Sequence, residues 1–203
     1  MVTPAEARAS PTEANRSPAS DREPPVLASA EQLLRAWRPP DDDQEQLRLH
    51  YLDHLAAHRD GWSRTCPGAH LTASSLICAP AEGQVLLTLH ARLGRWLQTG
   101  GHVEADDLSM AAAAGREAAE ESGLTRLDVD PEPLLLSRHE LSCSGRPTFH
   151  LDVQFLVTTS RSDPPRFGAE SLDVRWFRPD QLPGVDQSVL DLVAAADRRL
   201  SGA

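Results

Sequence analysis

The order of apolar and polar residues divides the chain into three parts. Residues 1–26 hold mostly Pro, Ser, Ala, Glu and Arg and almost no large apolar side chains. Such a segment buries too little surface to offset its ordering entropy, so it is predicted to be a disordered tail. Residues 27–68 are predicted to form a helical extension, because their apolar residues recur at helical spacing. Residues 69–203 are predicted to form a domain that contains strands.

The extension is predicted to contain two amphipathic helices. Ser29 can cap the first helix, and Pro39-Pro40 stops it. Asp41 opens an acidic run that can cap the second helix and favour its N-terminus. The apolar positions are Leu33, Leu34 and Trp37 in the first helix and Leu47, Tyr51, Leu52 and Leu55 in the second.

After residue 69 the pattern predicts a sheet interrupted by one helix. Strands are expected at 70–79 and 84–91, with a turn at 80–83, and a short one at 95–98. A Gly-Gly turn and a helix at 109–122 follow. The remaining apolar runs predict further strands and a C-terminal helix, at 127–141, 149–159, 172–177 and 187–200. Strands around a central helix, with helices at both ends, indicate an α/β (α+β) fold.

Composition and charge exclude several classes of protein. The net charge is −10 and all twenty cationic side chains are Arg, which is not the basic surface of a general nucleic-acid binder. No apolar run approaches the length of a membrane span, and the N-terminus lacks the pattern of a signal peptide. Cys66, Cys78 and Cys143 fit neither a disulfide framework nor a zinc site, so they are predicted to be reduced thiols of a cytoplasmic protein.

Three carboxylates after the Gly-Gly turn are the main candidates for chemistry. Ser109 can cap the helix that carries them, and Gly123 can end it. Glu117, Glu120 and Glu121 are spaced i, i+3 and i+4, which places them on one helix face. A divalent cation would relieve their mutual repulsion, and hard oxygen ligands suit Mg²⁺ or Mn²⁺. An ordinary solvated helix face is the alternative interpretation of these three residues alone.

The glycine turn and this helix together resemble the signature of the Nudix hydrolases. That signature has a glycine, five residues, Glu and seven residues, and then the order Arg-Glu-apolar-any-Glu-Glu-any-Gly-apolar. Gly101 opens it, and the nine residues from Arg116 to Leu124 match its end. Position six after Gly101 is Asp107 instead of Glu, and eight residues instead of seven separate it from Arg116. The extra residue is predicted to lie in the loop before the helix, where insertions are tolerated. The similarity extends over about residues 69–200.

The resemblance implies a mixed β-sheet sandwiched between helices, here with an N-terminal helical extension. It also implies hydrolysis of a diphosphate (pyrophosphate) linkage in a nucleoside diphosphate derivative by water that Mg²⁺, or Mn²⁺, activates. The implied catalytic residues are Arg116, Glu117, Glu120 and Glu121. The implied metal ligands are the Gly101 carbonyl and the carboxylates of Glu117, Glu120, Glu121 and Glu170. Arg116 would orient the carboxylates, and the choice of general base between Glu120 and Glu121 stays open. Glu170 could equally be a solvated loop residue.

Four residues outside this set are candidates for substrate binding. Arg95 could pair with phosphate, and Trp96 could stack on a base or belong to the core. His102 follows Gly101 directly, and His102 and His150 could bind phosphate, shuttle a proton or be structural.

The resemblance leaves the substrate open. A non-nucleotide diphosphate, such as a prenyl diphosphate, is one alternative, and a catalytically silent nucleotide-sensing module is another. Sensors tend to lose the acidic residues, which are all present here. The expected partner is a small-molecule diphosphate, with no membrane and no long nucleic acid. The helical extension could pack on the domain, cover the active site or form a homodimer contact.

Overall fold

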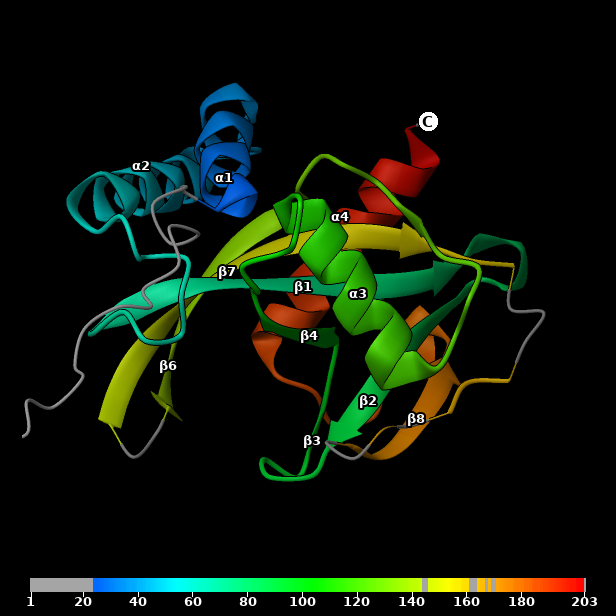
Figure 1. The fold of residues 1–203 in the computed structure, drawn as a ribbon. Helices are drawn as coiled ribbons and strands as arrows, with labels where there is room; N and C mark the ends of the chain where they lie inside the picture. The colour runs from blue at the N-terminus through cyan, green and yellow to red at the C-terminus, as the bar shows by residue number, and fades with distance from the viewer. Residues whose placement is uncertain (1–23, 144–145, 161–163, 167, 169–170, 203) are drawn as a thin grey trace, which may run out of the picture.

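An eight-stranded mixed sheet lies at the centre of the fold (Figure 1). The computed structural model describes residues 24–143, 146–160, 164–166, 168 and 171–202. The strands are β1 (Ala69–Ala79), β2 (Gln84–His90), β3 (Arg95–Leu97), β4 (Thr99–His102), β5 (Asp128–Val129), β6 (Leu135–Cys143), β7 (Arg146–Thr158) and β8 (Ser171–Phe177). The helices are α1 (Pro25–Ala36), α2 (Asp42–Ala57), α3 (Met110–Ser122) and α4 (Gln187–Ser201), with short 3₁₀ helices at Pro80–Glu82 and Pro179–Gln181.

A parallel pair of strands, β1 and β7, forms the middle of this sheet. The strand order is β3-β2-β1-β7-β5, with β4 also paired to β1, β6 to β7 and β8 to β2. The parallel register runs from Ala69 opposite Phe149 to Cys78 opposite Thr158, and the other described strand pairs are antiparallel. Residues 80 positions apart in the chain are therefore neighbours in space.

Helices cover both faces of the sheet, which confirms the predicted sandwich. Ala73 of β1 packs in a core cluster with side chains of α1, α2 and α3. Leu76 and Cys78, which lie on the other face, pack with α4. Figure 1 shows α3 in front of the sheet and α4 behind it. Neighbouring residues of a strand point to opposite faces, so β1 supplies both cores and is buried along nearly its whole length.

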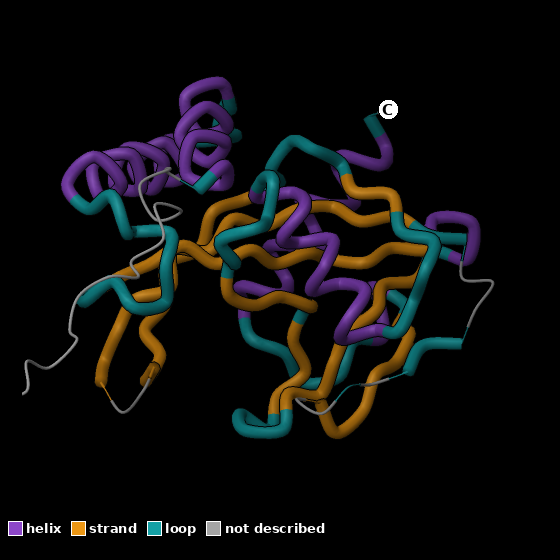
Figure 2. The backbone as a smooth tube through the Cα atoms, in the orientation of Figure 1, coloured by secondary structure: helices purple, strands orange, loops and turns teal. Residues whose placement is uncertain are grey.

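The helical extension is built into the first of these cores. Figure 2 shows α1 and α2 together at one end of the sheet. Val26, Leu34 and Tyr51 are fully or almost fully buried there. The Trp37 indole N–H donates to the Pro133 carbonyl at 3.0 Å, and the Tyr51 hydroxyl donates to the Ser137 carbonyl at 2.8 Å. Apolar burial and buried hydrogen bonds thus join the extension to the domain.

Capping residues in the sequence predicted the starts of α2 and α3 correctly, but not the start of α1. Asp41 caps α2 by accepting from the Gln44 N–H, and Ser109 caps α3 by accepting from the Ala112 N–H. The prediction that Ser29 caps the first helix was wrong, because α1 begins at Pro25, whose fixed φ suits a first helical position. Residues 25 and 26, placed in the tail by composition, belong to α1, while residues 1–23 lie outside the described residues.

Two strand predictions also needed revision. The run 127–141 is not one strand but the separate β5 and β6, with Pro131 and Pro133 between them. Proline has no N–H to donate to a sheet, so the pairing breaks there. The Gly-Gly turn is itself part of a strand, β4.

Two cysteines are buried, and burial keeps their thiols protonated. Cys66 and Cys78 are buried free thiols, as predicted, and burial raises their pKa to about 11 and about 12. The Cys143 side chain lies outside the described residues. Among the described helices, none combines the length and apolar character that a membrane span requires.

Tyr51→Ala is expected to lower the free energy of unfolding by about 3–5 kcal/mol, because it empties a fully buried aromatic position. Tyr51→Phe keeps the ring and loses only the hydroxyl, so it should cost about 1 kcal/mol. Urea unfolding of the full chain measures both. A Tyr51→Ala variant as stable as wild type would show that the extension contributes little to the core.

Candidate active site

The two glycines of β4 let strand β1 and the Glu117 side chain approach the β4 backbone closely. A Cβ on Gly100 would lie 2.4 Å from Ser74 Cβ and 2.7 Å from Ser74 Cα on the neighbouring β1. A Cβ on Gly101 would lie 2.5–2.6 Å from the three carboxyl-group atoms of Glu117. Glycine is therefore needed at Gly100, where a side chain would clash with the β1 backbone, whereas a side chain at Gly101 would displace the Glu117 carboxylate.

Helix α3 lies close to the sheet because small residues lie next to the carboxylates on its buried face. Ala113, Ala114 and Ala118 are fully buried and let the helix lie close to the sheet. Gly123 ends the helix in the left-handed conformation, with φ of 65°. Ser109 and Gly123 fix the helix ends, and thus which residues face β4.

Two of the three candidate carboxylates lie against β4. Glu117 packs on Gly101, and Glu121 Oε2 accepts from the Gly100 N–H at 3.1 Å. The Glu120 side chain is 62% exposed, and its carboxylate lies 3.7 Å from the Arg116 guanidinium. The structure thus brings Glu117 and Glu121 together at the glycines, with Glu120 at the solvent side.

Arg116 connects this helix to the loop before it. Its Nε and Nη2 donate to the two carboxylate oxygens of Asp107 at 3.1 and 3.0 Å. Nη1 donates to Glu117 at 2.7 Å, and Nη2 also donates to the His102 carbonyl at 3.0 Å. These partners raise the pKa of Arg116, with Asp107 the largest cause. The guanidinium is thus occupied by the protein and positions the Glu117 carboxylate.

Asp107, which stands six residues after Gly101 in place of the Glu of the signature, is buried in the loop before α3. It is 8% exposed, and besides Arg116 it accepts from the Glu104 N–H at 2.8 Å. The next residue, Leu108, is 74% exposed in the loop before α3. The loop in which the extra residue is predicted to lie thus exposes Leu108 to solvent.

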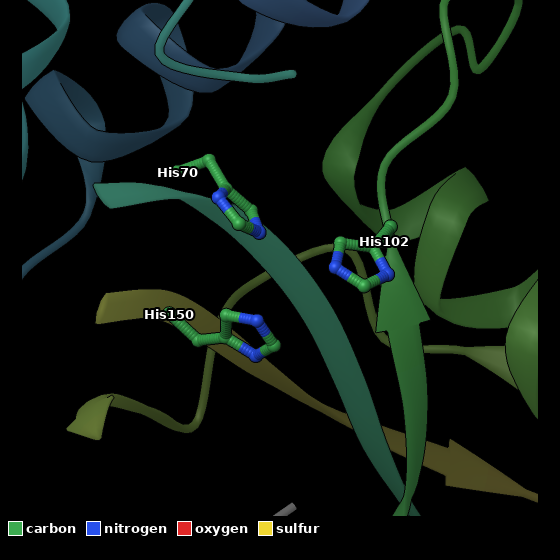
Figure 3. A group of neighbouring side chains, drawn as sticks. All are labelled: His70, His102 and His150. Carbon is green, nitrogen blue, oxygen red and sulfur yellow. The ribbon is translucent and has the colours of Figure 1, made fainter. Parts of the chain in front are cut away.

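Histidines from three strands gather next to the glycines (Figure 3). His70 of β1 pairs with His150 of β7, and Thr72, two residues after His70, pairs with His102 of β4. Paired residues share a face of a sheet, as do residues two apart, so the three rings lie on one face. Their ring centroids are 4.9–5.2 Å apart.

The pKa values of two of these histidines are strongly lowered. Burial, then the neighbouring His102, lowers the pKa of His70 to about 4. Burial, then His70, lowers the pKa of His150 to about 3. Both imidazoles are therefore neutral at neutral pH. No local sequence signal marks His70, and only the parallel register of β1 and β7 brings it to His150.

The remaining candidates have contacts away from the carboxylates. Arg95 pairs with Asp186 at 2.7 Å, and both side chains are about half exposed. Trp96 packs edge-on against Phe177, with centroids 5.0 Å apart, in the core beneath α4. Glu170 lies outside the described residues.

Comparison with known proteins decides the family. A family model described as "NUDIX domain" matches residues 69–200. The chain belongs to the Nudix family. Membership of this family indicates a hydrolase that acts on pyrophosphate bonds. A search of curated proteins finds no match.

Solved structures of Nudix proteins share the fold. An Ap4A hydrolase of C. elegans in a binary complex is 18% identical, with a TM-score of 0.54, and the match covers 66% of this chain and 98% of that one. The NUDIX domain of NrtR from Shewanella oneidensis, complexed with ADP ribose, is 20% identical, with a TM-score of 0.53 and coverage of 73% and 97%. A MutT protein from Methanosarcina mazei is 19% identical, with a TM-score of 0.52 and coverage of 64% and 94%. The TM-scores show that these proteins share the fold. Identities this low leave the substrate open.

Proposed function

We propose that the chain hydrolyses a diphosphate linkage in a nucleoside diphosphate derivative or a related small phosphorylated metabolite, with Mg²⁺ as its cofactor and Mn²⁺ as a possible replacement. The observation that carries the proposal is the placement of Glu117 and Glu121 against the two glycines of β4. The ion pair between Arg116 and Asp107 holds the guanidinium that donates to Glu117.

The donor atoms at this position fit a hard divalent cation. The Glu117 carboxylate occupies the space that a side chain at Gly101 would fill, so it lies directly beside the strand. Carboxylate and carbonyl oxygens are the ligands that Mg²⁺ prefers. The ligand set we propose is the Gly101 carbonyl with the carboxylates of Glu117, Glu120, Glu121 and Glu170. A bound cation would neutralise phosphate oxygens and lower the pKa of a coordinated water.

The chain's own residues divide the other tasks. Arg116 is a positioning residue, because its donors are directed to Asp107, Glu117 and the His102 carbonyl. Glu120 or Glu121 takes the proton of the attacking water. Glu120 is open to solvent, whereas Glu121 is held by Gly100, and this difference makes the two roles separable by experiment.

Substrate binding is proposed for four residues, of which only the two histidines lie beside the glycines. His102 and His150 lie beside the glycines and offer imidazole nitrogens to phosphate oxygens or to bound water. Arg95 can turn to a phosphate at little cost, because an exposed ion pair such as Arg95–Asp186 contributes little stability. Trp96 would bind through the part of its ring that Phe177 and Arg175 leave uncovered. Two buried thiols are consistent with activity in the reducing cytoplasm.

Phosphate release from a panel of diphosphates tests the proposal. The panel spans nucleotide sugars, dinucleoside polyphosphates, oxidised nucleoside triphosphates and prenyl diphosphates, each with Mg²⁺, Mn²⁺ or chelator. Metal-dependent turnover of one class far above the others is the expected result, with Glu121→Gln as the blank. Metal-dependent ligand binding with no turnover of any compound would contradict it and favour a sensing module.

A further inference from the structure

His70 is buried without a hydrogen-bond partner. Its side chain has no exposed surface, and neither Nδ1 nor Nε2 has a partner in the structure. Buried polar atoms in folded proteins are almost always paired, so a buried imidazole with two unpaired nitrogens requires an explanation. The burial that lowers its pKa also keeps it neutral, with a lone pair available.

The rings around His70 supply a second observation. One nitrogen from each of His70, His102 and His150 lies within 4.8 Å of the other two. Figure 3 shows the three side chains reaching this point from β1, β4 and β7. On a tetrahedral zinc ion with bonds of about 2.0–2.1 Å, two ligand nitrogens are about 3.4 Å apart. Each nitrogen would need to move by no more than about 1 Å to reach that separation.

We propose that His70, His102 and His150 form a binding site for Zn²⁺ or a divalent transition metal of similar chemistry, separate from the carboxylate cluster of α3. Imidazole nitrogens suit zinc, copper, nickel and iron, whereas Mg²⁺ and Mn²⁺ favour oxygen. The two sites therefore differ in the ions that they select, although Gly101 and His102 are adjacent on β4.

Three protein ligands leave one position of a tetrahedral ion open. His70 and His150 are buried, but His102 is partly exposed, so a small molecule would reach a bound ion from the His102 side. Water or an anionic oxygen of a phosphate could occupy it. A bound ion would also fix β4 to β1 and β7 through side chains, next to the glycine that holds Glu117.

Zinc binding by the full chain tests this site without an activity assay. After treatment with a chelator, wild type is expected to bind one Zn²⁺ per chain at the histidines, measured by titration against a chromophoric chelator in excess Mg²⁺. Saturating Zn²⁺ should raise the melting temperature by about 5–10 °C, the shift expected at about 100 times Kd. Co²⁺ should give the visible absorption of four-coordinate cobalt.

His70→Phe is the decisive variant, because it removes the unpaired nitrogens and keeps an aromatic ring in the buried position. Its metal-free form should fold and melt no lower than wild type, while its zinc affinity should fall at least about 100-fold. A stable His70→Phe variant that still binds zinc with wild-type affinity would overturn the proposal.

A matched control comes from a second group with metal-ligand spacing, His58, Asp60 and Cys66. Two of its members are exposed, and the raised pKa of Cys66 disfavours the thiolate that zinc requires. Cys66→Ser is therefore expected to leave the zinc affinity and the cobalt spectrum unchanged. Loss of binding in Cys66→Ser, or no zinc binding by wild type at all, would also overturn the proposal.

Discussion

Glu121→Gln is expected to lower the rate of diphosphate hydrolysis by about 10²–10⁴-fold, the range for loss of a general base. The fold should survive, because an amide oxygen can still accept from the Gly100 N–H. The change removes one negative charge at the point where the proposed cation and water meet. The measurement is kcat for the best substrate of the panel, together with thermal unfolding.

The Mg²⁺ dependence of this variant separates the two roles open to Glu121. If Glu121 is mainly a metal ligand, added Mg²⁺ should restore part of the activity; if it is the base, activity stays low at every concentration. Asp106→Asn is the matched control, because it removes an exposed carboxylate from the loop before α3. Near-normal turnover by Glu121→Gln would show that the carboxylate cluster is not the catalytic centre.

Asp107→Ala is expected to lower the free energy of unfolding by about 3 kcal/mol. Removing one partner of a buried ion pair typically costs about 3–5 kcal/mol, because the other charge is left uncompensated. The lower end applies here, since Arg116 keeps its contacts with Glu117 and the His102 carbonyl. The melting temperature should fall by about 6–12 °C for a chain of this size.

Activity should fall with stability in Asp107→Ala, because a released Arg116 no longer fixes Glu117. Asp107→Asn, which can still accept from Arg116 and from the Glu104 N–H, should lie between Asp107→Ala and wild type. Asp106→Ala, one residue away and exposed, should change neither quantity. Equal stability of the Asp107→Ala and Asp106→Ala variants would refute a structural role for the substituted Asp.

The parts of the site that are local in sequence could be predicted from it. Ser109, Gly123 and the Glu spacing define α3 without reference to the rest of the chain, and the structure has the helix between those two residues. The loop before α3 could also be predicted from local signals, and Leu108 lies in it.

The parts that depend on strand pairing could not be predicted. His70 looks like the polar start of a strand, and only the parallel pairing of β1 with β7 brings it to His150. Arg95 lies close to the glycines in sequence, but its strand turns back along β2 and its guanidinium meets Asp186. No local pattern records which distant strands become neighbours.

The parallel pairing of β1 with β7 also constrains when the protein can fold. A chain must close a loop of almost 80 residues before these two strands can meet, and contacts so distant in sequence make folding slow. During synthesis, β1, β4 and α3 leave the ribosome well before β7 does. Until then the central strand of the sheet lacks its partner, and the apolar edge of the nascent chain is exposed to aggregation. The stretch of translation between residues 79 and 158 is therefore the interval in which β1 lacks its parallel partner.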